Sequence, residues 1–209
     1  MDPYQITFQT WNKIAALYQE KFMDLDLYDD TYERFCQLVE KHPATVFEIG
    51  CGPGNITRYL LRKRPDFHIE AIDVAPAMIK RAKENVPDAC FRVMDVRKLD
   101  KITAVYDAIM CGFCLPYLSK ADSTKLFMDA ARLLVSGGIA YFSTIEGEYA
   151  RSGFEAGSTG DQCYVYYYTA DYLQEQLLAA GFDLVTQMQK HYAKGDTLST
   201  HIIQIVRKK

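Results

Sequence analysis

Short β-branched apolar runs alternate with helical patterns along most of this chain, and that alternation limits the possible folds more than any other feature. Strands are predicted at residues 44–50, 67–73, 89–95, 105–111 and 139–145. Helices are predicted at residues 55–64, 75–85, 120–138 and 171–182, the third closed by Gly137 or Gly138 as its C-terminal cap. This β-α-β-α order is typical of an α/β fold with a doubly wound, mostly parallel sheet.

The two ends of the chain depart from this alternation. Strands are predicted at residues 183–192 and 200–208, and the connection between them is too short for a parallel crossover. We therefore expect a seven-stranded sheet with a terminal antiparallel hairpin. Residues 1–43 repeat apolar side chains at helical spacing and predict N-terminal helices, whereas residues 146–168 form a long glycine- and tyrosine-rich segment that predicts a functional loop.

The composition narrows the possible partners and location. The chain has 209 residues, which suits one domain, and a net charge of −3, which argues against a nucleic-acid partner. It contains no apolar run of ~18 residues and no secretory leader pattern, so we expect no membrane partner and a cytoplasmic location. The six cysteines are then expected to be reduced thiols. The oligomeric state is not readable from these features.

Three glycines at alternate positions, Gly50, Gly52 and Gly54, follow the first predicted strand in the stretch VFEIGCGPGNITRYLL. A phosphate-binding P-loop would need a lysine directly after its last glycine, and none is present. A dinucleotide fingerprint would place a third glycine at position 55, where the chain has Asn55. A nicotinamide or flavin site is therefore disfavoured.

The ExGxGxG pattern that begins at Glu48 resembles motif I of the class I S-adenosylmethionine (SAM)-dependent methyltransferases. The resemblance spans roughly residues 44–208, because Asp73, Asp95, the stretch YDAIMCGFC and the LLVSGG junction follow in the family's order and spacing. It implies that SAM is the cofactor and S-adenosylhomocysteine (SAH) the product. The cofactor-binding residues that it implies are Tyr18, Glu48, Gly50, Cys51, Gly52, Asp73, Val74, Met78, Asp95, Val96, Cys111, Gly112 and Phe113.

The resemblance also implies individual roles. Asp73 accepts hydrogen bonds from the ribose hydroxyls and Asp95 from the adenine amino group. Cys111 to Phe113 contribute backbone contacts near the sulfur, with Cys114 in the core. Residues 1–43 form a helical cap over the cofactor site, in which Trp11 covers the site and Tyr18 reaches the methionyl group.

Fewer sequence motifs indicate the residues that would bind the methyl acceptor. Residues 44–209 are expected to form the methyltransferase domain, with residues 146–168 as its lid or acceptor segment. Tyr117 and Glu146 lie at the carboxyl edge of the predicted sheet and are the candidates for a catalytic base. Neither is assigned, and none of the four histidines has an assignable partner. Because motif IV lacks the Asn/Asp-Pro-Pro-aromatic stretch of the base methylases, a small-molecule acceptor is preferred.

Several alternatives stay open. The pair Cys111 and Cys114 has the C-x-x-C spacing of a redox site, but thioredoxin-like domains carry that pair on an early strand. No further thiols or imidazoles stand at zinc-ligand spacing, so no metal site is expected. The alternatives to a methyltransferase are an NAD(P)-dependent oxidoreductase and a SAM-binding regulatory module without catalysis.

Overall fold

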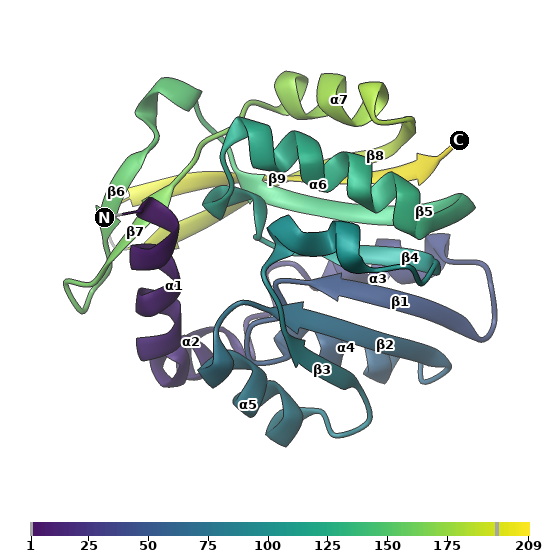
Figure 1. Cartoon of the computed structure of the whole chain (residues 1–209), viewed down its shortest axis with the longest axis horizontal. Helices are drawn as coiled ribbons and strands as arrows, with labels where there is room; N and C mark the ends of the chain where they lie inside the picture. Colours follow the sequence, from purple (N-terminus) through teal and green to yellow (C-terminus); the bar gives the residue numbers. More distant parts are fainter. Residues whose placement is uncertain (1, 195–196) are drawn as a thin grey trace.

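The computed structural model describes residues 2–194 and 197–209, and its largest element is a seven-stranded sheet in the order β3-β2-β1-β4-β5-β9-β8 (Figure 1). Its strands are β1 (Ala44–Ile49), β2 (Phe67–Asp73), β3 (Cys90–Val93), β4 (Tyr106–Cys111), β5 (Leu134–Ile145), β8 (Phe182–Lys194) and β9 (Thr197–Lys208). Strands β1 to β5 pair in parallel, and β9 pairs antiparallel with both β5 and β8. The predicted doubly wound sheet with its terminal hairpin is confirmed.

Helices cover both faces of the sheet. They are α1 (Pro3–Lys13), α2 (Ala15–Phe22), α3 (Asp29–Leu38), α4 (Asn55–Lys63), α5 (Pro76–Asn85), α6 (Lys120–Leu133) and α7 (Ala170–Ala179). Helices α3, α4 and α5 share one apolar core with Val46 and Met110, whereas α6 and α7 share another with Phe47 and Ile109. Adjacent strand residues enter opposite cores because side chains alternate across a sheet. Within the described residues, no helix is both long and apolar enough to cross a membrane.

The predicted helix over 120–138 is wrong at its C-terminal end. Helix α6 ends at Leu133, and Leu134 is already extended and paired with Tyr106 as the first residue of β5. Gly137 and Gly138 therefore lie in a strand and do not cap the helix. Gly137 has a φ of +76°, and a Cβ on Gly138 would lie 3.0 Å from the carbonyl oxygen of Asp107. The glycines permit an irregularity in the pairing of β4 with β5.

The segment at residues 146–168 contains more regular structure than a loop. It includes the short helix η3 (Tyr149–Arg151) and the antiparallel strands β6 (Gly153–Ala156) and β7 (Gln162–Val165). The hairpin β6–β7 lies beside α1 at one end of the main sheet (Figure 1). The short connection between β8 and β9 falls on residues 195–196, outside the described residues.

The three N-terminal helices occupy different positions. Helix α3 packs on the main sheet, with Tyr32 and Phe35 in the core that it shares with β1 and β4. Helices α1 and α2 lie beyond the carboxyl ends of β1, β2 and β4, next to α5 and β7 (Figure 1). Of residues 2–43, α1 and α2 are therefore the part that stands over the predicted cofactor turn.

Candidate functional site

The turn between β1 and α4 brings the backbone to the edge of the sheet. The amides of Gly50 and Cys51 both donate to the carbonyl of Ile72, at 2.8 and 3.0 Å, which holds the turn against β2. Gly50 has a φ of +72°, and a Cβ built on it would lie 3.2 Å from the Cβ of Cys114. A larger residue would strain the backbone and push against the start of η2 (Leu115–Tyr117).

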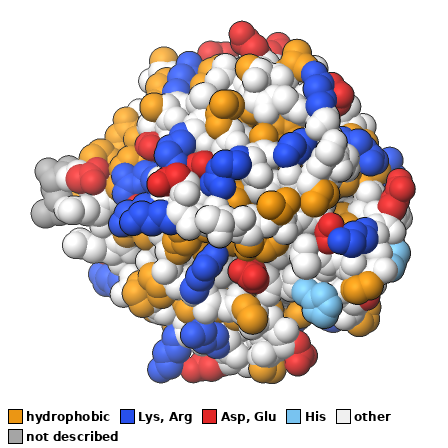
Figure 2. Space-filling model, turned by 45° about the vertical axis from the view of Figure 1, so that its right-hand side comes forward, with side chains coloured by type: hydrophobic (Ala, Val, Ile, Leu, Met, Phe, Trp, Pro, Cys, Tyr) orange, Lys and Arg blue, Asp and Glu red, His pale blue; other side chains and the backbone are white. Residues whose placement is uncertain are grey.

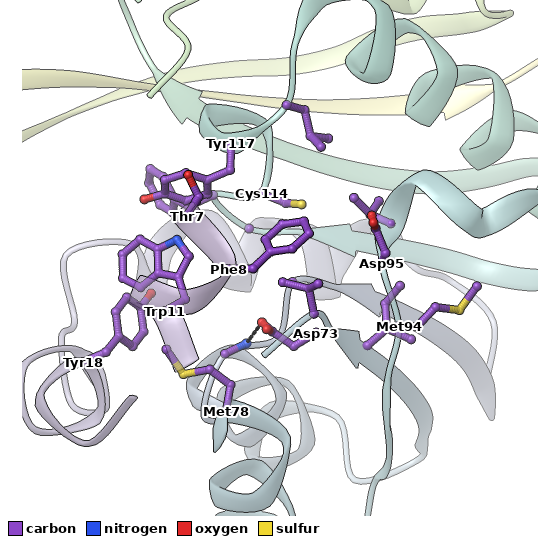
Figure 3. A pocket seen from close by; sticks show the side chains of 18 residues that line it. Thr7, Phe8, Trp11, Tyr18, Asp73, Met78, Met94, Asp95, Cys114 and Tyr117 are labelled. Atoms are coloured by element: carbon purple, nitrogen blue, oxygen red, sulfur yellow. Dashed lines mark hydrogen bonds between the residues drawn. The ribbon is translucent and has the colours of Figure 1, made fainter. Parts of the chain in front are cut away.

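The carboxylate of Asp73 is fixed by the backbone around it. One oxygen accepts from the Gly52 amide at 2.9 Å (Figure 3), and the other accepts from the Ala75 amide at 2.8 Å. Burial raises the pKa of Asp73 above its usual value. Each oxygen keeps a lone pair beyond these bonds, so the carboxylate can accept two further hydrogen bonds from a ligand.

Asp95 is held by a cation. It begins helix η1 (Val96–Lys101), and its carboxylate accepts from the backbone amide and the guanidinium of Arg97, the latter at distances down to 2.6 Å. The Arg97 guanidinium also lies 4.0 Å from the ring centre of Tyr4 on α1. Hydrogen bonds from Arg97 lower the pKa of Asp95, although burial acts in the opposite direction.

Aromatic side chains from α1, α2 and η2 line the same pocket as the turn. The ring planes of Tyr18 and Tyr117 make angles of 87° and 72° with the ring plane of Trp11, with centroids 5.5 and 5.2 Å away (Figure 3). Trp11 and Tyr18 also pack on Met78, which anchors both helices to α5. The indole Nε1 of Trp11 is buried and has no hydrogen-bond partner in the described structure.

Hydrogen bonds connect α1 to α6 and β7. The Tyr4 hydroxyl donates to the Asp122 carboxylate at the start of α6. Thr10 donates to the Gln162 carbonyl at 2.7 Å, and the Tyr164 amide donates to the Thr7 hydroxyl at 3.0 Å. Because Gln162 and Tyr164 belong to β7, the first helix and the β6–β7 hairpin form one connected cover, which we call the roof.

The turn, the strand ends and helix α1 line a pocket of about 100 Å³ that is partly open to solvent. Of the predicted site residues, those that line it are Tyr18, Gly50, Gly52, Asp73, Val74, Met78, Asp95, Val96, Gly112, Phe113 and Tyr117. The structure adds Thr7, Phe8, Ile72, Met94, Cys114 and Leu118, and it includes Trp11. The helical spacing of Thr7, Phe8 and Trp11 indicates one face of α1, but the sequence does not say what that face covers.

Four predicted site residues lie outside the pocket wall. Cys51 and Cys111 are buried in the two cores, and the expected core residue Cys114 lines the pocket instead. Glu146 is half-buried beside β8, where it accepts from the Gln189 amide at 3.1 Å. Glu48 lies beneath the turn.

Glu48 is almost fully buried, with 1% of its surface exposed. Its Oε2 accepts from the Thr57 hydroxyl at 2.6 Å, whereas Oε1 has no partner in the described structure. Burial raises the pKa of Glu48 to about 8. The side chain is therefore mainly protonated at neutral pH, and it supports the turn from below.

His201 has partners that the sequence did not reveal. Its Nδ1 lies 2.6 Å from the Tyr28 hydroxyl, and its Nε2 lies 3.1 Å from the Ser199 hydroxyl. The ring packs edge-on against Phe113 from behind the pocket wall. Burial lowers the pKa of His201 to about 4, so the imidazole is neutral at pH 7.

The pocket residues fit SAM. The oriented Asp73 carboxylate suits a pair of ribose hydroxyls, and Met78, Met94 and Val96 offer apolar surface for a flat base. Asp95 keeps acceptor capacity for an exocyclic amine. The aromatic rings of Trp11, Tyr18 and Tyr117 suit a sulfonium cation, because ring faces attract positive charge.

Comparisons with known proteins agree with this fit. Residues 46–138 match the methyltransferase domain family. Trans-aconitate 2-methyltransferase of Escherichia coli is 36% identical over 94 residues, which are 45% of this chain and 36% of that protein. Malonyl-[acyl-carrier protein] O-methyltransferase 1 of Ilyobacter polytropus is 30% identical over 131 residues, 54% of this chain and 47% of that protein. The chain thus spans about a third to a half of the length of these relatives.

Solved structures show the same fold. The 1,6-didemethyltoxoflavin-N1-methyltransferase of Burkholderia thailandensis, with 1,6-didemethyltoxoflavin and SAH bound, has a TM-score of 0.76 at 18% identity. The superposition covers 100% of this chain and 91% of that chain. A SAM-dependent methyltransferase from Clostridium acetobutylicum has a TM-score of 0.72 at 17% identity, with 95% and 99% of the two chains covered. Residues 46–138 thus match the methyltransferase domain family, and the chain has the fold of solved SAM-dependent methyltransferases.

Proposed function

We propose that the protein transfers the methyl group of SAM to a small molecule. One observation supports this above all others: the glycine turn and Asp73 line the same pocket as the aromatic side chains of Trp11, Tyr18 and Tyr117, with the Tyr18 ring next to Gly52. A cofactor held by the turn and Asp73 would lie beside these rings. Residues of the pocket wall other than Gly50, Gly52 and Asp73 are proposed to complete the cofactor site and begin the acceptor site.

The enclosure of the pocket supports a small acceptor. Helix α1 lines the pocket, and its bonds to β7 and α6 leave limited room for a macromolecular chain. On the face drawn in Figure 2, Lys and Arg side chains lie among acidic and apolar ones, and the net charge is −3. Neither feature favours nucleic acid. Trans-aconitate and 1,6-didemethyltoxoflavin, the compounds that appear in the names of two similar proteins, are also small molecules.

Methyl transfer from SAM would require the protein mainly to align the nucleophile, the methyl group and the sulfur. SAM supplies a methyl group already activated by its sulfonium. The turn and Asp73 would orient the cofactor, and Trp11 and Tyr117 would exclude water and position the nucleophile. We propose α1, α2 and residues 146–168 as the elements that close over the acceptor, while α3 supports the sheet.

Calorimetric titration tests the cofactor half of the proposal. SAM and SAH are expected to bind with micromolar or better affinity, and NAD is expected to give no heat. Tight NAD binding without a response to SAH would indicate an oxidoreductase. Incubation with isotopically labelled SAM and a metabolite extract tests the second half. If SAM binds and no labelled product forms with any fraction, the protein is a regulatory module and the proposed activity is refuted.

A further inference from the structure

The backbone of Phe113 has a conformation that a bulky residue rarely adopts. Its φ is +53°, and among the residues that the structure describes it is the one residue other than glycine with a positive φ. An L side chain in this left-handed region is crowded, because its Cβ approaches the following carbonyl oxygen. A conformation of this kind persists only where the surrounding structure holds it. Phe113 must therefore be held in place by its neighbours.

The turn that contains Phe113 forms part of the pocket wall. Gly112, Phe113 and Cys114 follow β4 directly, and all three line the pocket. A Cβ on Gly50 would lie 3.2 Å from the Cβ of Cys114, so this turn is in contact with the glycine turn. A Cβ on Gly112 would lie 2.3 Å from the Cδ1 of Ile56, so it also packs closely on α4. A change in the backbone of Phe113 would therefore displace Cys114 relative to Gly50 and alter the shape of the pocket.

A side chain on the neighbouring strand holds the backbone of Phe113. The Phe113 amide donates to the Oγ of Ser143 at 2.9 Å. Regular pairing of β4 with β5 ends at Cys111 and Phe142, and Ser143 is the next residue of β5. The Ser143 hydroxyl thus accepts where the parallel ladder no longer offers a backbone carbonyl. Ser143 is 1% exposed, so loss of its hydroxyl would leave the amide without this acceptor in a site shielded from water.

The ring of Phe113 is held separately, by packing alone. Its centroid lies 5.0 Å from the centroids of both Tyr28 and His201. The Ser199 hydroxyl donates to the Tyr192 carbonyl at 3.2 Å and therefore accepts from the Nε2–H of His201. The Nδ1 of His201 then accepts from the Tyr28 hydroxyl at 2.6 Å. These bonds fix the two rings that flank Phe113, but none of them reaches its backbone, which leaves that task to Ser143.

We propose that Ser143 is a positioning residue for the cofactor pocket. Its hydroxyl holds Phe113 in the left-handed conformation, and this conformation sets Cys114 against the glycine turn at Gly50. The inference rests on the proposed function, because it takes this pocket as the place where SAM and SAH bind. Without the hydroxyl, the backbone of Phe113 relaxes toward a right-handed conformation, and a ligand must then restore the shape of the pocket as it binds.

Calorimetric titration of SAH into Ser143→Ala tests the role of the hydroxyl. The Kd for SAH is expected to rise about tenfold, the scale for one shielded amide left without its acceptor. Ser123→Ala is the matched control. Ser123 is a fully buried serine on α6 whose hydroxyl donates to the Lys120 carbonyl at 3.0 Å, and it does not line the pocket. Its replacement should leave the Kd for SAH unchanged.

Glycine at position 113 provides a readout that a merely structural role of Ser143 would not change. Glycine adopts a positive φ without steric crowding, so it needs less support from the Ser143 hydroxyl. Ser143→Ala should therefore raise the Kd by a clearly smaller factor in a Phe113→Gly background than in the wild type. If Ser143 only stabilised the fold, the factor would be the same in both backgrounds.

The outcomes separate this inference from the proposed function. If the wild-type protein does not bind SAH, the proposed function fails. If it binds SAH and Ser143→Ala binds equally well, or if the factor is the same in both backgrounds, the role of Ser143 is overturned. Ser143→Cys, which keeps a weak acceptor of similar size, carries the test if the alanine variant does not fold. Its Kd should lie above that of the wild type, and an unchanged Kd would also overturn the role.

Discussion

Replacement of Glu48 by glutamine should change how the stability of the protein depends on pH. The carboxyl is buried, and one of its oxygens has no partner in the described structure. Its pKa is about 8 in the folded chain, against about 4.3 in an unfolded one. A group whose folded pKa is raised stabilises the fold fully below its unfolded pKa and loses that contribution as pH rises through its folded pKa. Glutamine carries no titrating proton and should remove this dependence.

The magnitude follows from the two pKa values. Between them, one group changes the free energy of unfolding by about 1.4 kcal/mol per pH unit. From pH 5.5 to pH 8.5, Glu48 should therefore cost the wild-type protein about 3 kcal/mol, because most of that range lies below its folded pKa. The stability of Glu48→Gln relative to wild type should rise by this amount across the range. The hydroxyl of Thr57 can still donate to the amide oxygen, so the local packing is kept.

Urea unfolding of both proteins at pH 5.5, 7.0 and 8.5, without added SAM, measures this difference. Equal m-values at each pH would show that the comparison concerns stability alone. Glu175→Gln, at an exposed position on α7, serves as the matched control and should run parallel to wild type. If Glu48→Gln also runs parallel to wild type, Glu48 is ionised in the folded protein and the reasoning from its burial is refuted.

Substitutions at three further positions test the pocket. Asp73→Ala should weaken SAH by about 1–3 kcal/mol in calorimetry, the scale for hydrogen bonds to a charged group, and unchanged affinity would show that the site lies elsewhere. Gly50→Val should lower the free energy of unfolding by at least about 1 kcal/mol, because φ is +72° and a Cβ would press on Cys114; a neutral effect in urea unfolding would contradict the left-handed backbone at Gly50. Arg97→Ala should speed hydrogen exchange in α1, since it removes the contact with Tyr4, while Arg97→Lys should have a smaller effect. Equal exchange in all three proteins would show that Arg97 does not hold the roof.

Much of the fold is predictable because alternation and glycine placement act locally. The strand at 44–50, the turn after it and the terminal hairpin all follow from short stretches of sequence. The end of α6 does not follow from a short stretch of sequence. Gly138 has the position of a helix cap in the sequence, but its role depends on the close approach of the Asp107 carbonyl in the neighbouring strand.

The positions of some pocket residues follow from local sequence patterns, whereas others depend on tertiary packing. Asp73 and Gly50 are set by the ends of β2 and β1, so their positions follow from the strand pattern. Cys114, expected in the core, lines the pocket because Phe113 before it turns the chain with a φ of +53°. Thr7 and Phe8 reach the pocket only through the packing of α1 against β7, which no local pattern encodes.

The connection of α1 to β7 has a consequence for how such a protein can diversify. The roof joins residues near the start of the chain to residues more than 150 positions later, and both segments lie outside the family match at 46–138. The atoms that β7 contributes to these two bonds are backbone atoms, so the bonds require hydroxyl side chains at Thr7 and Thr10 on α1 but no particular side chain at positions 162 and 164. Side chains of β7 can therefore change, and the acceptor with them, while α1 and the turn at Gly50 stay unaltered.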